Sequence, residues 1–458
     1  MNIPNILQHH KKFFSTQKTK DISFRKLALQ KLLQELQKRE KEITDALYLD
    51  FKKSEFEAVL TETAIVISEL KLTLKKMNSW AKPKHITPTV LNFPSSSKIY
   101  REPYGTVLII APWNYPFQLA LAPLIGAVAA GNTVVLKPSE LTPNTSKIIH
   151  KIITTVFEKN HVAIIEGGVS VSQELLAQYW DYIFFTGSVH VGKIIAKAAA
   201  ENLTPVTLEL GGKNPCIIDE TANLKLAAKR IVWGKFINAG QTCIAPDYLL
   251  IHTSVKEKFV SFFKQEIAHA YGENPQESND YPRIVNQRNF DRLATMLSNE
   301  TFLVGGKTDK NDLYISPTLI DQPHLDSEVM KGEIFGPISP IISYIDVSEI
   351  DKIISKYNKP LALYVFTTNN TFAKKIIKKH TFGGGTINDT TVHFANNRLP
   401  FGGVGESGIG SYHGKQTFDL FSHKKGIVKR YNWLDIPLRY APYNGKLKTL
   451  KTFMKYFS

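Results

Sequence analysis

The chain has 458 residues, too many for one ordinary hydrophobic core, so we expect two or three domains. Its apolar fraction of 43% and charged fraction of 21% are typical of soluble globular proteins and exclude a disordered chain. Two cysteines exclude a disulfide scaffold and a cysteine-based zinc site, and the histidines show no HxxxH spacing, so we expect no metal centre. Because no secretory leader and no long apolar run is visible, we expect a cytoplasmic protein.

The net charge of +16 is unevenly distributed. Residues 413–458 carry ten Lys and Arg side chains and only two acidic ones, which accounts for half of the net charge. The simplest interpretation is a solvated basic tail on a mildly charged body. A nucleic-acid binder would explain this charge and no other feature of the sequence, so we expect no nucleic-acid partner.

Residues 22–80 are predicted to form long amphipathic helices, because apolar residues recur every three or four positions with Lys and Glu between them. Three prolines between positions 83 and 94 interrupt this pattern, and residues 87–105 are predicted to be an extended connection. Short apolar runs then alternate with helical segments. The runs are GTVLII, TVVLKP, VAIIEGG, YIFFTGS and PVTLELGG, which together predict a Rossmann-like parallel sheet covered on both faces.

The alternation starts again after Gly212. The segments PCIIDE, LKLAAKRIVWGKF, YLLIH and VKEKFVSFFKQEIAHAYG predict a second α/β domain. Glycine then clusters in FGGGTIND and in PFGGVGESGIGSYHG, ahead of the basic tail. The predicted fold class is therefore α/β, with one parallel-sheet domain following another.

The turn FFTGSVHVGK follows the fourth of the predicted strands and opens a helix. Gly187 and Gly192 bracket it with the spacing G-x-x-x-x-G, which is not the dinucleotide fingerprint G-x-G-x-x-G and arises easily by chance among 27 glycines. A helix N-terminus nevertheless presents free N–H groups to a phosphate. Its position in the strand–helix series therefore favours a phosphate site, although the pattern alone does not.

The two cysteines have different surroundings. Cys243 lies in NAGQTCIAP, between a helical run and a strand and among small or polar residues. A thiol in such a loop is a candidate nucleophile, because its thiolate is intrinsically very reactive. Cys216, in the apolar segment NPCIID, is interpreted as a core residue that behaves as a small hydrophobe.

Polar residues at strand ends form a second group of candidates. Glu209 closes the apolar strand PVTLELGG, where burial would raise its pKa toward that of a general base, unless it is simply a solvated strand end. Asn114 follows the first strand and could donate to an oxyanion, or serve only the turn. Lys137 and Glu140 follow the second strand, where Rossmann-type sheets place groups that contact a ribose.

Taken together, the segments APWNYPF, LKPSE, FTGS, LELGGK, GQTC, EIFGP and PFGG resemble the motifs of the NAD(P)-dependent aldehyde dehydrogenases. They follow that family's order and spacing over about residues 20–440. The short chain and the segment NAGQTCIAPDYLL are most similar to the class 3 branch, which includes fatty-aldehyde enzymes. The family's own cofactor turn also lacks the usual dinucleotide fingerprint.

The resemblance implies a role for each matching residue. Cys243 matches the nucleophile, Glu209 the carboxylate that activates the thiol or hydrolytic water, and Asn114 the amide that holds the oxyanion together with the Cys243 backbone N–H. The residues implied to bind the cofactor are Lys137 and Glu140 at the adenosine ribose, Gly187 and Ser188 near the pyrophosphate with Gly192 closing their turn, Glu333 at the nicotinamide ribose and Phe335 beside the nicotinamide ring.

The activity implied is oxidation of aldehydes to carboxylic acids with NAD or NADP, through a thiohemiacetal and a thioester on Cys243. One alternative is a CoA-acylating dehydrogenase, which would pass the acyl group to a thiol, but the presence of Glu209 favours hydrolysis. Another is a cofactor-binding scaffold without catalysis, against which the intact Cys243, Glu209 and Asn114 argue. Since Glu140 would repel a 2′-phosphate and Lys137 would attract it, we expect NAD with usable NADP.

The resemblance also implies the domain boundaries and a homodimer. Residues 1–80 and 101–208 would form the cofactor-binding domain, and residues 209–400 the catalytic domain. Residues 81–100 and 401–458 would form a small bridging and oligomerisation element with the basic tail.

On a helical wheel the end of this tail has an apolar and a basic face. The apolar face comprises Leu447, Leu450, Phe453, Met454 and Phe457, and the roughly opposite basic face Lys448, Lys451 and Lys455. The apolar face would pack on the enzyme body or a dimer partner, or lie weakly on a membrane surface.

Overall fold

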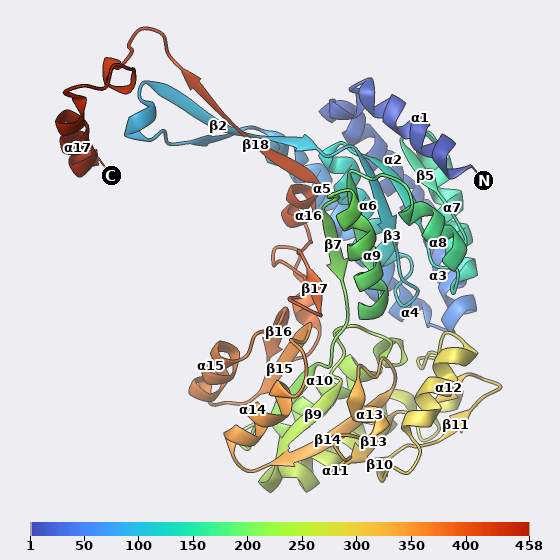
Figure 1. Cartoon of the computed structure of the whole chain (residues 1–458). Helices are drawn as coiled ribbons and strands as arrows, with labels where there is room; N and C mark the ends of the chain where they lie inside the picture. Colours follow the sequence, from blue (N-terminus) through green and yellow to red (C-terminus); the bar gives the residue numbers. More distant parts are fainter. Residues whose placement is uncertain (1, 458) are drawn as a thin grey trace.

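The computed structural model describes residues 2–457, apart from the side chains of Leu91, Tyr456 and Phe457. One parallel-sheet domain lies above another, and a long arm of paired strands leaves their side and carries the C-terminal helix at its far end (Figure 1). The predicted α/β class with parallel Rossmann-like sheets is thereby confirmed.

The first sheet has the strand order β17-β7-β6-β3-β4-β5. Strands β7 to β5 in this order run parallel to their neighbours, and β17 pairs antiparallel with β7 at the edge. The bounds are β3 Thr106–Ile110, β4 Thr133–Lys137, β5 Val162–Ile164, β6 Tyr182–Thr186, β7 Val206–Glu209 and β17 Gly408–Ile409. Since carboxyl ends of parallel strands share one edge, Lys137, Thr186 and Glu209 end at the same side of the sheet.

Both faces of this sheet are buried, which explains why its strands are apolar without alternation. Val107 and Ile109 of β3 belong to one core with the helices α2, α3, α5, α6 and α7, whereas Leu108 and Ile110 belong to another with α1, α8 and α9. The helix bounds are α1 Ile3–Ser15, α2 Ile22–Lys38, α3 Glu40–Phe51, α4 Glu55–Ala58, α5 Ala64–Ala81, α6 Gln118–Ala130, α7 Pro143–Val156, α8 Val169–Leu176 and α9 Val189–Glu201.

The predicted amphipathic region 22–80 is helical but not uniform. A π-helical turn, Val59–Thr63, joins α4 to α5. Glu62 in this turn is fully buried, where it pairs with Lys53 at 2.8 Å and accepts hydrogen bonds from the backbone N–H groups of Phe117 and Gln118 at the start of α6. The turn therefore fixes α6 against the N-terminal helices.

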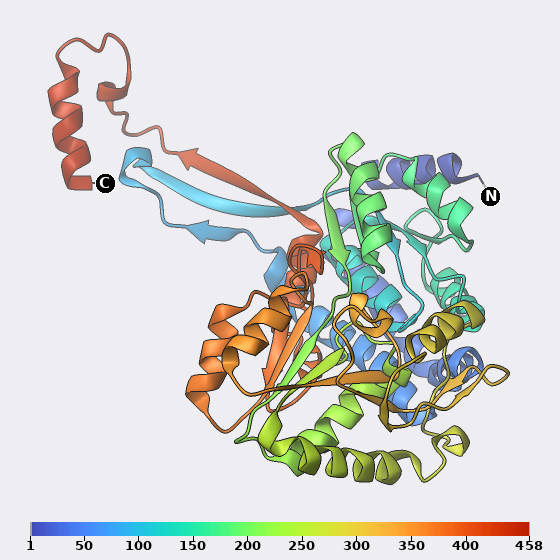
Figure 2. The ribbon, with the colours of Figure 1, turned by 60° about the horizontal axis from the view of Figure 1, so that its bottom comes forward.

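The second sheet has the order β10-β13-β14-β9-β8-β15-β16 and is parallel except for β10. Its strand bounds are β8 Pro215–Ile218, β9 Tyr248–His252, β10 Phe302–Val304, β13 Thr318–Asp321, β14 Ile338–Tyr344, β15 Ala362–Phe366 and β16 Gly384–Ile387, with a separate ribbon of β11 Thr308–Asp309 and β12 Tyr314–Ile315. Its helices are α10 Leu224–Phe236, α11 Lys256–Tyr271, α12 Gln287–Met296, α13 Glu328–Lys331, α14 Val347–Ser355 and α15 Asn370–Lys379, and they surround this sheet in Figure 2.

The arm is formed by segments from opposite ends of the sequence. The predicted extended connection contains β2 Ser95–Pro103, and β1 Lys84–Ile86 lies just before it. β2 pairs antiparallel along its whole length with β18 Ser422–Arg430. Helix α16 Lys415–Leu420 precedes β18 and packs on α6. These segments fall in the predicted bridging element, except that β2 continues to Pro103, beyond its predicted end at residue 100. The domain boundaries stay a prediction.

Helix α17, Lys446–Phe457, lies at the far end of the arm, away from the body in both ribbon views (Figures 1 and 2). Leu447 and Met454 on the predicted apolar face are exposed, and the side chain of Phe457 lies outside the described residues. The alternative that this face packs on the enzyme's own body therefore does not hold in this structure. Within residues 2–457, no helix is both long enough and apolar enough to cross a membrane.

Candidate active site

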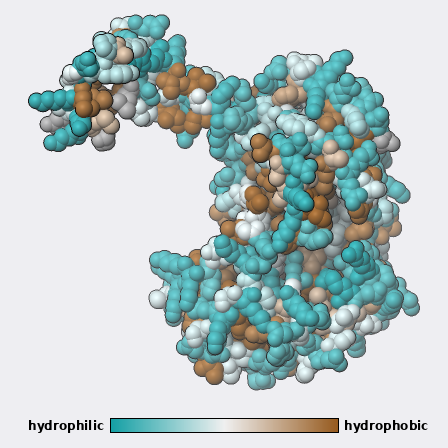
Figure 3. All heavy atoms as spheres, in the orientation of Figure 1, coloured by the Kyte–Doolittle hydropathy of each residue, from teal (hydrophilic) through white to brown (hydrophobic). Residues whose placement is uncertain are grey.

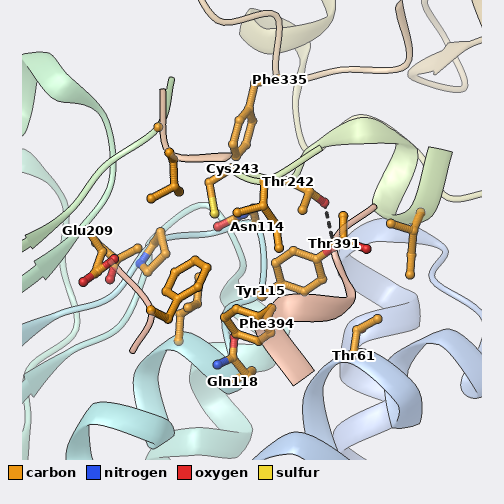
Figure 4. A pocket seen from close by; sticks show the side chains of 18 of the residues that line it. Thr61, Asn114, Tyr115, Gln118, Glu209, Thr242, Cys243, Phe335, Thr391 and Phe394 are labelled. Atoms are coloured by element: carbon orange, nitrogen blue, oxygen red, sulfur yellow. Dashed lines mark hydrogen bonds between the residues drawn. The ribbon is translucent and has the colours of Figure 1, made fainter. Parts of the chain in front are cut away.

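A pocket of about 460 Å³ lies between the ends of the first sheet and the loops of the second domain. It brings together residues predicted from separate motifs: Asn114, Gly187, Ser188, Glu209, Cys243, Glu333 and Phe335. Lys137, Glu140 and Gly192 do not line it. Figure 4 shows the Cys243 sulfur beside Asn114, with Glu209 on one side and Phe335 on another.

The loop that carries Cys243 has an unusual backbone. Asn238, Ala239 and Gly240 are consecutive residues with φ of 53°, 50° and 72°, in the left-handed region. A side chain at Gly240 would place its Cβ 2.3 Å from the carbonyl oxygen of Gly336. The glycine of GQTC is thus needed both for its φ and for the close approach of the neighbouring EIFGP segment.

Hydrogen bonds hold this loop from several directions. The Gln241 side chain donates to the carbonyls of Asn238 and Arg283 at 3.0 Å each and accepts from the N–H of Val285. The Asn238 side chain donates to the carbonyl of Asn114 at 2.8 Å, and the amide of Asn114 donates to the carbonyl of Gln241 at 3.1 Å. The candidate oxyanion amide and the cysteine loop are therefore fixed to one another.

Residues on neighbouring elements complete this support. The Tyr115 hydroxyl forms a 2.6 Å hydrogen bond with the Thr242 hydroxyl, drawn as a dashed line in Figure 4. Asn214 donates to the carbonyl of Cys243 at 2.7 Å. The buried side chain of Glu57 accepts a hydrogen bond from the N–H of Asn238 at 2.8 Å. Burial raises the pKa of Glu57 to about 7. Sequence reasoning missed Glu57, because a glutamate in an amphipathic helix carries no signal that it turns inward.

Cys243 is partly exposed to the pocket, whereas Cys216 is fully buried. Burial, followed by the negative charges of Glu333 and Glu209, raises the pKa of the Cys243 thiol far above its ordinary value. The neutral thiol is thus the stable form in this apolar cavity. A nucleophile at this position needs a base or a nearby positive charge.

Glu209, the last residue of β7, is 3% exposed, and among the described residues neither carboxylate oxygen has a hydrogen-bond partner. Burial alone raises its pKa well above the ordinary value. A carboxyl left without partners in a cavity is costly for folding and well suited to exchange a proton with a bound molecule.

The carboxylate of Glu333 packs against Gly211, where a residue with a side chain would clash with it. A Cβ at Gly211 would lie 2.0 Å from a carboxylate oxygen of Glu333. Burial, then the charge of Asp247, raises the pKa of Glu333 to about 8. Its Oε1 atom has no partner among the described residues, so a hydroxyl-bearing group in the pocket would find an acceptor there.

The predicted cofactor turn has the geometry of a helix N-terminus. Ser188 caps α9 by accepting from the N–H of Val191 at 3.4 Å, and Gly187 lies between β6 and this cap. Gly192 is buried in the first turn of α9, where a Cβ would come within 2.7 Å of Leu210. Gly192 therefore serves the packing of the helix on the strand that carries Glu209.

Lys137 and Glu140 lie at the end of β4 and bind each other, with the Lys137 Nζ 2.7 Å from the Glu140 Oε2. The Lys137 side chain is 3% exposed and that of Glu140 39%. Lys137 ends β4 at the same edge of the sheet from which β6 leads into α9, and parallel sheets of this kind bind a dinucleotide at that edge. Within residues 2–457, no group of His, Cys, Asp or Glu side chains could hold a metal ion.

Much of the remaining wall of the pocket is apolar, although Arg292 and Asn289 also line it. Leu60, Ile65, Trp233, Val392 and Phe394 line it, and they belong to the N-terminal helices, to α10 and to the segment after β16. No motif drew attention to these residues, since apolar side chains of this kind look like ordinary core in the sequence. The pocket thus combines a polar end with an apolar channel.

Comparison with known proteins identifies the same family as the motifs. A model described as "Aldehyde dehydrogenase family" matches residues 2–427. The 4,4'-diaponeurosporen-aldehyde dehydrogenase of Staphylococcus aureus is 49% identical over 97% of both chains. Aldehyde dehydrogenase family 3 member A2 of Macaca fascicularis is 44% identical over 92% of this chain and 86% of its own. The predicted resemblance to the class 3 branch is confirmed.

A third relative and a solved structure add further likenesses. An aldehyde dehydrogenase of Canis lupus familiaris, described as dimeric and NADP-preferring, is 41% identical over 97% of this chain and 99% of its own. A structure described as the substrate-bound state of Staphylococcus aureus AldH superposes with a TM-score of 0.97 at 48% identity, over 99% of this chain and 100% of that one.

Proposed function

Because the chain belongs to the aldehyde dehydrogenase family, and is thus an enzyme that oxidises aldehydes, we propose that it does so through a thioester on Cys243 with NAD or NADP as oxidant. The observation that carries this proposal is the convergence of Cys243, Glu209 and Asn114 on one pocket. A CoA-acylating enzyme and an inactive scaffold are not favoured, because the relatives are aldehyde dehydrogenases and all three side chains are present.

Glu209 takes the proton of the Cys243 thiol and passes it to solvent while the sulfur attacks the aldehyde carbon, and the resulting oxyanion is held by the Asn114 amide and the Cys243 backbone N–H. The hydrogen bond between Asn114 and the carbonyl of Gln241 keeps this amide beside the sulfur. Glu209 then takes a proton from water, which attacks the acyl carbon and releases the acid. The raised pKa of Glu209 supports this role, because a base of ordinary acidity would take up that proton poorly near neutral pH.

The dinucleotide, when bound, supplies the acceptor for hydride. Glu333 would accept from the hydroxyls of the ribose next to the reacting ring, and Ser188 with the α9 N-terminus would receive the pyrophosphate. Lys137 and Glu140 oppose one another at the other ribose, which supports use of both NAD and NADP. An NADP-preferring relative agrees with this dual use.

The apolar channel formed by Trp233, Phe394 and their neighbours suits aldehydes with an apolar chain. Such a substrate is desolvated by the channel while its carbonyl reaches Cys243. The Staphylococcus aureus relative is described as a 4,4'-diaponeurosporen-aldehyde dehydrogenase, so an aldehyde is the substrate named for it as well.

We also propose that the arm mediates a homodimer in the cytoplasm. Ile427 and Val428 of β18 and Trp433 beyond it are exposed at 43%, 49% and 70%. Figure 3 shows apolar side chains gathered on the arm, where a monomer would leave them in water. A relative described as dimeric agrees with this arrangement, which analytical ultracentrifugation of the parent and an Ile427→Lys/Val428→Lys variant tests.

For α17 we propose weak contact with an anionic membrane surface. Residues 446–457 contain four lysines and no acid, and exposed Leu447 and Met454 lie on the apolar face. Sedimentation with anionic and with neutral vesicles tests this, comparing the full chain with one ending at Tyr443. Binding that needs residues 444–458 and anionic lipid supports the contact, and equal sedimentation of both chains contradicts it.

The proposed reaction is tested by following the reduced cofactor with a series of aldehydes from propanal to dodecanal, using NAD and NADP in turn. We expect turnover with both cofactors and a free acid as the product. Addition of CoA separates the alternatives, because an acyl-CoA product would overturn hydrolysis. Absence of reduced cofactor with every aldehyde would overturn the proposed chemistry altogether.

A further inference from the structure

A smaller cavity of about 160 Å³ adjoins the main pocket on the side of α5 and α6. Ala64 and Ser68, one turn apart on α5, lie at its exposed rim. Gln118, Tyr412 and His413 form its buried end. The cavity therefore leads from the surface at α5 into the protein.

The buried end of this side cavity presents polar atoms that the protein does not satisfy. His413 Nδ1 has no hydrogen-bond partner among the described residues, and Gln118 Nε2 and Tyr412 OH have none there except each other. Each of the three side chains is more than nine-tenths buried. An unpaired buried polar group costs about 1–3 kcal/mol. Water satisfies such groups when the cavity is large enough, and 160 Å³ exceeds what one molecule needs.

An acid also faces this cavity. Glu69 is 5% exposed and accepts a hydrogen bond from the N–H of Gly414 at 2.8 Å. Burial raises the pKa of Glu69 to about 7. The wall thus holds groups that can donate to water and groups that can accept from it, which makes the cavity a hydrated space and not an apolar void.

Shared residues connect the side cavity to the reacting centre. Ile65, Gln118, Phe394 and Tyr412 line both cavities. The pKa of Tyr412 is raised first by burial and then by the charges of Glu209, Cys243 and Glu69. Glu209 and Cys243 line the main pocket and Glu69 lines the side cavity, so Tyr412, which lines both, lies where the two cavities meet. In Figure 4 Gln118 lies on the side of Cys243 away from Phe335.

An apolar acyl chain creates the need for such a path. Once attached to Cys243, a long chain fills the apolar channel through which the aldehyde came in, and the dinucleotide occupies the polar end. Water then cannot reach the thioester through either opening. A short acyl group leaves the channel open.

We propose that the side cavity holds the water that hydrolyses long-chain acyl thioesters, an inference that rests on the proposed function of Cys243 and Glu209. Water passes from the rim at Ser68 to the end at Gln118 and Tyr412, and from there to Glu209. Glu209 removes one proton while the water oxygen bonds to the acyl carbon. The carbon–sulfur bond then breaks, the acid leaves, and the proton returns to the Cys243 thiolate.

The experiment blocks the rim and measures decay of the acyl-enzyme directly. Ala64→Leu/Ser68→Leu fills the opening with two exposed side chains on α5, so the fold is expected to tolerate it. Ser79→Leu introduces the same residue at an exposed site of the same helix away from the cavity, and Ser68→Ala removes the hydroxyl without filling space. Each protein reacts with cofactor and either dodecanal or propanal, and quenched samples are weighed as intact proteins by mass spectrometry.

We expect the blocked variant to hydrolyse the dodecanoyl adduct at least about tenfold more slowly than the parent, with the propanoyl adduct unchanged. Ser79→Leu and Ser68→Ala should match the parent with both. Parental decay of the dodecanoyl adduct in the blocked variant, or equal slowing with both chain lengths, would overturn the proposed path. Failure of the proposed function is separately visible, because Glu209→Gln would then accumulate no adduct on Cys243.

Discussion

The two cysteines of this chain provide an internal comparison between a core position and a reactive one. Cys216 lies in the middle of β8, paired with Tyr364 of β15 on one side and Leu249 of β9 on the other. Cys243 lies in a loop with left-handed residues before it and a cavity in front of it. Burial raises the pKa of both thiols.

The difference between them is therefore not in intrinsic acidity. Cys216 has a regular strand, apolar neighbours and no access to a ligand. Cys243 has a base, an amide donor and an opening within reach of its sulfur. Reactivity at this site comes from neighbours that a strand interior cannot supply. The predictions below change the sulfur, the base, the backbone of the loop and a nearby charge in turn.

The largest effect should come from the sulfur itself. Cys243→Ala should lower kcat by at least about a thousandfold, because no other group in the pocket replaces the nucleophile. Cys216→Ala should keep kcat within about twofold and lose roughly 1 kcal/mol of unfolding free energy. Steady-state kinetics and urea unfolding of both variants measure this, with cofactor titration as a control for binding. A comparable loss of turnover in both variants would mean that the two cysteines do not differ in function.

Removal of the base should separate the two half-reactions. Glu209→Gln should lower steady-state turnover by about 10²–10⁴-fold while the first hydride transfer still occurs. A burst of reduced cofactor equal to the enzyme concentration, then a slow phase, is the expected trace in stopped flow. An unchanged steady-state rate would mean that this carboxyl is only structural.

The backbone of the Cys243 loop can be tested with matched glycines. Gly240 and Gly272 have similar φ values of 72° and 77°. A Cβ at Gly240 would lie 2.3 Å from the carbonyl oxygen of Gly336, whereas a Cβ at Gly272 would have no atom within 4 Å. Gly240→Ala should lower kcat about tenfold or more. Gly272→Ala, at φ 77° and ψ 178°, should leave kcat unchanged and cost about 1–3 kcal/mol of stability. Equal kinetic effects would mean that the strained loop does not position the sulfur.

The smallest expected effect concerns the charge of Glu333. Its pKa of about 8 means that it is mostly neutral at lower pH and negative at higher pH, where it opposes formation of the Cys243 thiolate. Glu333→Gln should therefore leave alkylation of Cys243 by iodoacetamide unchanged near about pH 6.5 and accelerate it a few-fold near about pH 9. Cys216 should stay unmodified throughout. Acceleration at the lower pH would contradict this order of titration.

Much of the fold followed from the sequence because its strands carry a strong local signal. The apolar runs that end at Lys137, Thr186 and Glu209 are strands of the first sheet, and their shared edge carries predicted site residues. The motifs also led to residues that lie far apart in the sequence and line one pocket, namely Asn114, Glu209, Cys243 and Glu333, whose roles stay a prediction.

What the sequence could not supply depends on distant contacts. Helix α1 was not expected, because its burial depends on a sheet face that forms from residues 106–209. The pairing of β2 with β18 joins two segments whose patterns are weak and polar. Glu57 likewise acts on Asn238 across the fold, and no local pattern reports such a contact.

The chain is synthesised from its N-terminus, so a strand whose partner is distant in the sequence stays unpaired until that partner has been made. β7 gains its edge partner β17, and β2 its partner β18, only after more than 400 residues have been made. Until then the growing chain presents two unpaired strand edges, which are sites for association with other chains. Nascent chains stalled before residue 408 should accordingly be more prone to aggregate and to recruit chaperones than chains released with both strands complete.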